Sequence, residues 1–309
     1  MSNITHTACV GAGVIGASWA ALFLASGRSV AVFDPAETAE KAVRTYIETA
    51  WPALTELGLT DHGTPDAISF HTSAAAAVEG ADFVQENVPE RIAIKHATFA
   101  EIEPLLKPTA IVASSASGLT LGQMQAGWQT PSRFVLGHPF NPPHLIPLVE
   151  VMGNDKTTPG VVDAARTFYE SLGKVTIRVN REVPGHVANR LQAALWREAI
   201  HLVLEGVASV DDVDKAVWAG PGLRWAAMGP TTLFHLGAGE GGLEAFCEHF
   251  ADTFNGWWDG LGKPHLDAAT REAMVKGMAD ASAGQSPADL SARRDALITA
   301  MQKATRDLR

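Results

Sequence analysis

Hydrophobic and polar positions follow two kinds of pattern in the first half of the chain. Short apolar runs, typical of buried strands, are separated by stretches in which apolar residues recur every three or four positions, as in helices. The runs predict strands at 7–11, 29–34, 68–71, 83–86, 110–114, 134–137, 148–151 and 174–179. The stretches predict helices that include 14–26, 37–57 and 159–172. This order predicts a mostly parallel sheet joined by crossover helices.

The pattern changes at Pro184-Gly185. From there to the end of the chain the spacing is helical, and no run predicts a strand. The first of these helices, 186–204, places Val187, Leu191 and Leu195 on one face. The last one begins at Ser286-Pro287-Ala288-Asp289, where a capping hydroxyl precedes a first-turn proline and an acidic residue. We therefore expect two domains, 1–183 and 184–309.

Composition narrows the classes of protein and partner. Hydrophobic residues make up 46% of the 309 residues and charged residues 19%, which is typical of globular chains. The longest apolar run, 19–25, is far shorter than the roughly 20 residues that cross a bilayer. The net charge of −10 argues against nucleic acid and anionic membranes as partners. Because the first residues lack a signal-peptide pattern and Cys9 and Cys247 have no CxxC spacing, we expect a cytoplasmic protein without structural metal.

A glycine-rich turn joins the first predicted strand to the first helix. Residues 11–16 read Gly-Ala-Gly-Val-Ile-Gly and fit the G-x-G-x-x-G pattern of dinucleotide sites, although glycines at such a turn can also serve turn geometry alone. Asp34 ends the second strand, where a carboxylate binds ribose hydroxyls and repels a 2′-phosphate. The pattern therefore predicts NAD rather than NADP, bound by Gly11, Gly13, Val14, Ile15, Gly16 and Asp34.

These features predict an α/β chain with a Rossmann-type doubly wound sheet, followed by an all-helical C-terminal domain. Residues 1–183 are then the NAD-binding domain, and 184–309 a separate helical domain. Glu90 and Lys95 follow the fourth strand at the edge of the sheet where ligands bind. We expect them to line the cofactor; the alternative is a solvated loop with a surface lysine.

A histidine and a carboxylate occupy strand positions in the same region. His138 follows the strand at 134–137, and Glu150 lies in the otherwise apolar run 147–151. A carboxylate beside an imidazole fixes its tautomer and stabilises the imidazolium, which suits a general base. A histidine at the end of a strand is also often a core or loop residue, and this alternative stays open on pattern alone.

Taken together, several motifs resemble the L-3-hydroxyacyl-CoA dehydrogenase superfamily over about residues 5–250. They are the glycine turn, Glu-x-x-x-Glu at 86–90, Ser117, His-x-x-Asn-Pro at 138–142, Val-Glu-Val at 149–151 and Pro-Gly-x-x-x-Asn-Arg at 184–190. The resemblance implies NAD-dependent oxidation of a 3-hydroxyl group, with His138 as the base, Glu150 as its partner, and Ser117 and Asn189 on the substrate oxygen. It places Glu90, Lys95 and Asn141 near the nicotinamide and substrate. It also implies a homodimer formed through the helical domain.

The segments 141–147, 194–199, 222–230 and 239–242 are more similar to the branch that contains L-carnitine 3-dehydrogenase and L-gulonate 3-dehydrogenase, the latter related to lambda-crystallin. Aromatic faces bind trimethylammonium groups, and the chain has eight Trp. We therefore expect L-carnitine as the substrate, with Phe140, Trp196 and Trp225 as a candidate cage and Arg224 for its carboxylate. Core or interface positions for the tryptophans, and ion pairs for the arginine, are the structural alternatives. L-Gulonate, a 3-hydroxyacyl-CoA, and a crystallin-like NAD-binding role without turnover remain the alternative functions.

Overall fold

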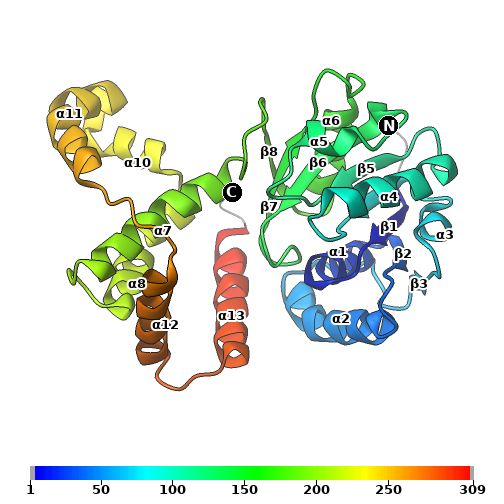
Figure 1. Cartoon of the computed structure of the whole chain (residues 1–309), viewed down its shortest axis with the longest axis horizontal. Coiled ribbons are helices and arrows are strands. Elements are labelled where there is room, and N and C mark those ends of the chain that lie inside the picture. Colours follow the sequence, from blue (N-terminus) through cyan, green and yellow to red (C-terminus); the bar gives the residue numbers. More distant parts are fainter. Residues whose placement is uncertain (1–3, 307–309) are drawn as a thin grey trace. The chain divides into compact units, whose positions relative to one another are not determined.

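The computed structural model describes residues 4–306, which divide into two compact units. We call residues 4–187 and 291–306 the sheet unit and residues 188–290 the helical unit (Figure 1). The sequence-based division assigned everything after residue 183 to the helical domain. In the structure, the chain instead returns to the sheet unit at residue 291.

A single eight-stranded sheet forms the centre of the sheet unit, in the order β3-β2-β1-β4-β5-β6-β7-β8 (Figure 1). All neighbouring strands are parallel except β6 and β7, which are antiparallel. The predicted doubly wound sheet is therefore confirmed. Its strands are β1 His6–Val10, β2 Ser29–Phe33, β3 Ile68–Phe70, β4 Phe83–Glu86, β5 Ile111–Ser114, β6 Phe134–Pro139, β7 Leu148–Met152 and β8 Val175–Arg178.

Helices cover both faces of the sheet. One face packs against α1 (Val14–Ala25), α2 (Ala39–Glu56) and α6 (Val161–Glu170), and the other against α3 (Ala74–Val78), α4 (Ile92–Ile102) and α5 (Leu121–Gln125). Because side chains alternate along a strand, Cys9 of β1 joins the first core while Ala8 and Val10 join the second. The stripe predicted on α6 is buried as expected: Val162, Ala165, Phe168 and Leu172.

The final helix, α13 (Pro287–Thr305), begins as predicted and then packs on the sheet unit. Ser286 Oγ accepts a hydrogen bond from the amide of Asp289 at 3.2 Å, which satisfies an amide at the start of the helix. Near its end, the side chain of Gln302 donates to the carbonyl of Leu145, and Lys303 Nζ lies 2.8 Å from a carboxylate oxygen of Glu56. A helical pattern does not reveal which unit a helix contacts, so the sequence alone did not place it here.

The helical unit contains α7 (Ala188–Leu204), α8 (Val210–Ala219), α9 (Pro221–Ala227), α10 (Pro230–Gly237), α11 (Gly242–Gly260) and α12 (Ala268–Ser282). The apolar face predicted on α7 is not covered by the described chain, since Leu191 is 65% exposed and Leu195 38%. Trp218 and Leu223 are similarly exposed. Among the residues that the structure describes, no helix is long and apolar enough to cross a membrane.

Candidate active site

The glycine turn between β1 and α1 has a shape that only glycine permits at two positions. Gly11 has φ +86°, and a Cβ there would lie 2.7 Å from the backbone of Asn87. A Cβ on Gly16 would lie 2.0 Å from the carbonyl oxygen of Gly11. At Gly13, the N-cap of α1, a Cβ would meet nothing within 4 Å, and no side chain caps the helix. The amides of the first turn and the open space beside Gly13 therefore suit the pyrophosphate of a dinucleotide.

Asp34 follows β2 and contacts the same turn. Its Oδ2 accepts a hydrogen bond from the amide of Ala12 at 2.7 Å, and its Oδ1 accepts one from Ala36 at 3.0 Å. The carboxylate thus braces the glycine turn and remains partly exposed beside it. This position agrees with the predicted role on the ribose of NAD, and the charge disfavours a 2′-phosphate.

We expect Asp34→Ser to raise the KM for NAD by about tenfold or more, because it removes charged hydrogen bonds worth roughly 1.5–3 kcal/mol. The preference for NAD over NADP should fall as well, since the repulsion of the 2′-phosphate is lost. Steady-state kinetics with both cofactors measure these changes, and Glu37→Gln, at an exposed neighbouring carboxylate, is the matched control. An unchanged KM for NAD in Asp34→Ser would contradict the assignment.

Glu86 and Lys95 form a buried ion pair under the segment that follows β4. Lys95 Nζ lies 2.7 and 2.9 Å from the two carboxylate oxygens of Glu86, and the side chains are 1% and 0% exposed. Glu86 also accepts from Ser114 Oγ and the amide of Val88. Lys95 therefore holds the segment that follows β4 in place. It also lines a small cavity of about 200 Å³ together with Glu90 and Ser117. Contact of Lys95 with the cofactor stays a prediction.

Glu90 binds the loop that follows β5. Its carboxylate accepts hydrogen bonds from the amides of Ser117, Gly118 and Leu119 and from the hydroxyl of Ser117 at 3.1 Å. Burial alone would raise the pKa of Glu90, but these bonds outweigh it and lower that pKa, so the carboxylate is charged at neutral pH. Because Ser117 donates its proton to Glu90, its oxygen presents lone pairs to a ligand in this arrangement.

The structure brings His138 and Glu150 together. They are directly opposite each other in the antiparallel pair β6–β7, and His138 Nδ1 lies 2.7 Å from Glu150 Oε2. The side chains are 6% and 0% exposed, and Glu150 Oε1 accepts the amide of Val187 at 2.8 Å. A carboxylate only accepts, so Nδ1 carries the hydrogen and Nε2 of the neutral ring has a free lone pair. This arrangement leaves Nε2 able to accept a proton, as the predicted role of general base requires.

His186 is a third member of this region that the sequence analysis did not single out. Its ring centroid lies 5.1 Å from that of His138, and its Nε2 donates to the carbonyl of Ala116 at 3.2 Å. Burial lowers the pKa of His186, with the neighbouring His138 acting in the same direction, so the ring is neutral. Its position after Pro184-Gly185 and its φ of +49° mark a tight turn, for which that dipeptide was the available signal.

The loop between β6 and β7 carries Asn141 and is held in place by hydrogen bonds to Ser18 of α1 and to Lys174. The amide of His144 donates to Ser18 Oγ of α1 at 2.8 Å, and Ser18 Oγ lies 2.9 Å from His144 Nδ1. Lys174 Nζ donates to the carbonyls of Pro143 and Ile146 and lies 5.2 Å from the ring centroid of Trp19. The loop beside the catalytic pair is therefore tied to the helix that starts at the glycine turn.

Protonation of His144 should weaken the fold. Burial lowers its pKa from the ordinary 6.5 to about 4, and a charged Nδ1 has no lone pair for the Ser18 hydroxyl. The unfolded chain therefore binds this proton at a higher pH than the folded one. We expect the free energy of unfolding to fall between pH 6.5 and pH 4, with a contribution of about 3 kcal/mol from this residue.

Urea unfolding across this pH range measures the effect, with His144→Asn as the comparison because its amide oxygen replaces the Nδ1 acceptor without titrating. In the variant, the free energy of unfolding should fall less steeply between pH 6.5 and pH 4, because the contribution of His144 is absent. Equal slopes in both proteins would refute the assignment.

The remaining predicted substrate residues are placed as follows. Phe140 lies beside His138, with their ring centroids 6.2 Å apart in an edge-to-face arrangement. Asn189 lies in the first turn of α7 and is half-buried. Arg224 is exposed, as are Trp196 (50%) and Trp225 (38%), so neither tryptophan belongs to a packed core within the described residues. Their predicted roles stay predictions.

Comparison with known proteins gives these residues a family. Residues 6–183 match the 3-hydroxyacyl-CoA dehydrogenase NAD binding domain, and residues 185–275 match the C-terminal domain of the same enzymes. The chain belongs to the 3-hydroxyacyl-CoA dehydrogenase family. NAD as the cofactor and the NAD-dependent oxidation of a CH–OH group, both predicted from the sequence, are thereby confirmed.

Relatives that match nearly the whole chain are named for one substrate, L-carnitine. The L-carnitine dehydrogenase of Streptomyces coelicolor is 46% identical over 98% of this chain and 95% of its own length. That of Nocardiopsis dassonvillei is 45% identical over 99% and 93%. Among solved structures, a 5-formyl-3-hydroxy-2-methylpyridine 4-carboxylic acid 5-dehydrogenase, described as an NAD+-dependent dismutase, superposes with a TM-score of 0.83. It is 32% identical, and the match covers 98% of this chain and 99% of that one.

Proposed function

We propose that this protein is an L-carnitine 3-dehydrogenase, which oxidises the 3-hydroxyl of L-carnitine to a ketone. The observation that carries the chemistry is the buried His138–Glu150 pair, which leaves Nε2 of His138 as a free proton acceptor. The substrate follows from the relatives, because eight proteins that are 39–46% identical over at least 94% of this chain are named L-carnitine dehydrogenase.

In the proposed reaction, Nε2 of His138 takes the proton of the 3-hydroxyl as the C3–H bond breaks. The glycine turn and Asp34 would hold NAD, which would supply the acceptor for the hydride that leaves C3. The buried carboxylate of Glu150 stabilises the imidazolium and holds the ring in the tautomer that the reaction needs. Asn189 has the role that the family resemblance implies, as a contact of the oxygen that becomes the carbonyl. Ser117 has the same implied role, for which its hydroxyl would turn from Glu90 to donate to that oxygen.

The quaternary ammonium group of carnitine carries no N–H donor, so aromatic faces are the appropriate protein partners for it. Phe140 supports this part of the proposal because its ring lies beside His138 and is only partly buried. Trp196 and Trp225 are proposed as further aromatic contacts and Arg224 as the partner of the carboxylate. Substitution of Phe140 by Leu is expected to raise the KM for carnitine more than it lowers kcat.

A substrate panel tests the function. NADH formation is measured with L-carnitine, L-gulonate and 3-hydroxybutyryl-CoA, each with NAD and with NADP. We expect the highest kcat/KM with L-carnitine and NAD. Activity only on the CoA thioester would replace the proposed substrate with that of the acyl-CoA enzymes. NAD binding without turnover of any compound would support the crystallin-like alternative.

We also propose a cytoplasmic homodimer, formed through the helical unit. Its apolar side chains support this because Leu191, Trp218 and Leu223 are each at least 64% exposed in the single chain. Exposed apolar surface of this extent is typical of subunit interfaces. Sedimentation equilibrium gives the mass in solution, and a monomer at micromolar concentration would contradict the proposal.

A further inference from the structure

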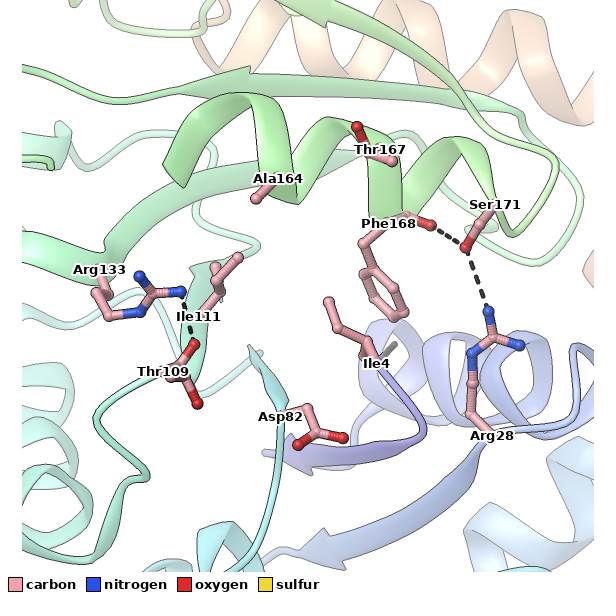
Figure 2. Close-up of a pocket in the computed structure, with 10 residues that line it drawn as sticks. All are labelled: Ile4, Arg28, Asp82, Thr109, Ile111, Arg133, Ala164, Thr167, Phe168 and Ser171. Carbon is pink, nitrogen blue, oxygen red and sulfur yellow. Dashed lines mark hydrogen bonds between the residues drawn. The ribbon is translucent and has the colours of Figure 1, made fainter. Parts of the chain in front are cut away.

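A second cavity lies at the amino-terminal ends of the central strands, away from the candidate active site at their carboxyl-terminal ends. Its volume is about 320 Å³, within the range of small-molecule sites, and α6 forms one wall (Figure 2). Asp82, Ile111 and Arg133 line it from the amino-terminal ends of β4, β5 and β6. His138 and the loop after β5 lie at the carboxyl-terminal ends. The cavity is therefore separate from the residues assigned to the reaction.

Two arginines on opposite sides of this cavity have no acidic partner (Figure 2). Arg133 donates to the carbonyls of Ala110 (2.9 Å) and Thr109 (2.6 Å). Arg28 donates to the carbonyl of Ser26 and the hydroxyl of Ser171. Within residues 4–306, no carboxylate forms an ion pair with either guanidinium. The two positive charges are thus held in place by neutral oxygens.

The one acidic side chain that lines the cavity, Asp82, already has hydrogen-bond and ion-pair partners. Asp82 accepts the amides of Thr5 and His6 on Oδ2, at 3.1 and 3.0 Å, and Lys107 Nζ lies 2.8 Å from its Oδ1. Asp82 therefore does not neutralise the arginines, and the cavity keeps a net positive charge. This charge stands out in a chain whose net charge is −10.

Unused hydrogen-bond donors remain on the guanidinium groups. Arg28 Nε is buried and has no partner among the described residues, and burial lowers the pKa of Arg133. A buried donor without a partner destabilises the fold, and the cost is larger when the group is charged. An anion that binds in the cavity would satisfy these donors and offset the charge. Guanidinium groups favour carboxylates because their geometry allows two parallel hydrogen bonds.

Apolar side chains form part of the surface between the two arginines. Figure 2 shows Ile4 and Phe168 in this position, and Ile111 and Ala164 also line the cavity, together with Asp82 and the hydroxyl-bearing Thr109, Thr167 and Ser171. A ligand that fits must therefore carry anionic groups at two ends and a short hydrocarbon segment between them. We propose that this cavity binds a short-chain aliphatic dicarboxylate, with one carboxylate on Arg28 and the other on Arg133.

Isothermal titration calorimetry of the full-length protein with succinate, glutarate and adipate tests this proposal, with acetate and inorganic phosphate as single-anion probes. We expect saturable binding of at least one dicarboxylate below about 10 mM, and binding at least about tenfold weaker for acetate and phosphate. Arg28→Gln and Arg133→Gln should each weaken dicarboxylate binding by about tenfold or more. Arg293→Gln, at an exposed arginine outside the cavity, should not change it.

Because Arg133 also holds backbone carbonyls, its substitution can unfold the protein, and a blocking variant provides an independent test. Thr167 is exposed on α6 at the cavity, so Thr167→Trp should fill the opening while both arginines and the fold remain. It should abolish dicarboxylate binding without changing the melting temperature or the turnover of carnitine. Absence of binding in the wild-type protein, equal binding of phosphate, or unchanged binding in Thr167→Trp overturns the proposal.

Discussion

His138→Gln is expected to lower kcat for carnitine oxidation by about 10²–10⁴-fold, because a glutamine amide cannot accept the hydroxyl proton as imidazole does. The loss should persist at alkaline pH, for example at about pH 8.5, because a glutamine amide does not become a base at any assay pH. Binding of NAD should change little, since the glycine turn and Asp34 do not contact this side chain in the structure. Initial rates and fluorescence titration of NADH measure the two effects separately.

His62→Gln is a suitable control for this experiment, because His62 is exposed and lies far along the chain from the catalytic pair. Its rates should equal those of the wild-type protein. Turnover of His138→Gln within about tenfold of the wild type at alkaline pH would exclude His138 as the base.

Glu150→Gln is expected to lower kcat by a similar factor, about 10²–10⁴, for a different reason. Each carboxylate oxygen accepts from a donor, since His138 Nδ1–H binds one oxygen and the amide of Val187 binds the other. A glutamine has only one acceptor oxygen, so its amide group must face one of these donors or force the other tautomer of His138. In that tautomer Nε2 carries the hydrogen and cannot take the proton of the substrate.

This variant should also lose stability by about 1–3 kcal/mol, because a buried donor is left without an acceptor. Thermal unfolding measures that loss, and Glu48→Gln, at an exposed carboxylate on α2, is the matched control. Wild-type rates in Glu150→Gln would show that the carboxylate does not act through His138. A loss of stability without a loss of rate would restrict Glu150 to a structural role.

The alternation of apolar runs was sufficient to predict the sheet, because six of the eight strands carry buried residues, whereas β3 and β8 are at most partly buried. The glycine turn was equally visible, since its backbone geometry restricts Gly11 and Gly16 to glycine, and Asp34 was recognised from its place at the end of the second strand. His138 and Glu150 were singled out as a candidate pair because His138 ends one apolar run and Glu150 interrupts another. Their pairing across β6 and β7 required no long-range information beyond a short connection between the two strands.

Other features depended on contacts that a one-dimensional pattern does not contain. Lys174 looks like an ordinary surface lysine in the sequence, yet it is 7% exposed and holds the carbonyls of the β6–β7 loop. His144 and Ser18 are separated by 126 residues but bind each other. Neither the return of α13 to the sheet unit nor the arginine cavity has a local signature, because each is assembled from segments far apart in the chain.

The antiparallel pairing of β6 and β7 has a consequence for engineering the enzyme. Pairing register fixes which face of the sheet each side chain takes, so a one-residue slip of β7 would turn Glu150 away from His138. The loop of residues 140–147 lies outside that register and connects the two strands beside His138. Insertions near Phe140 should therefore change the surroundings of His138 while its contact with Glu150 is preserved, provided that the contacts of His144 and Lys174 are retained.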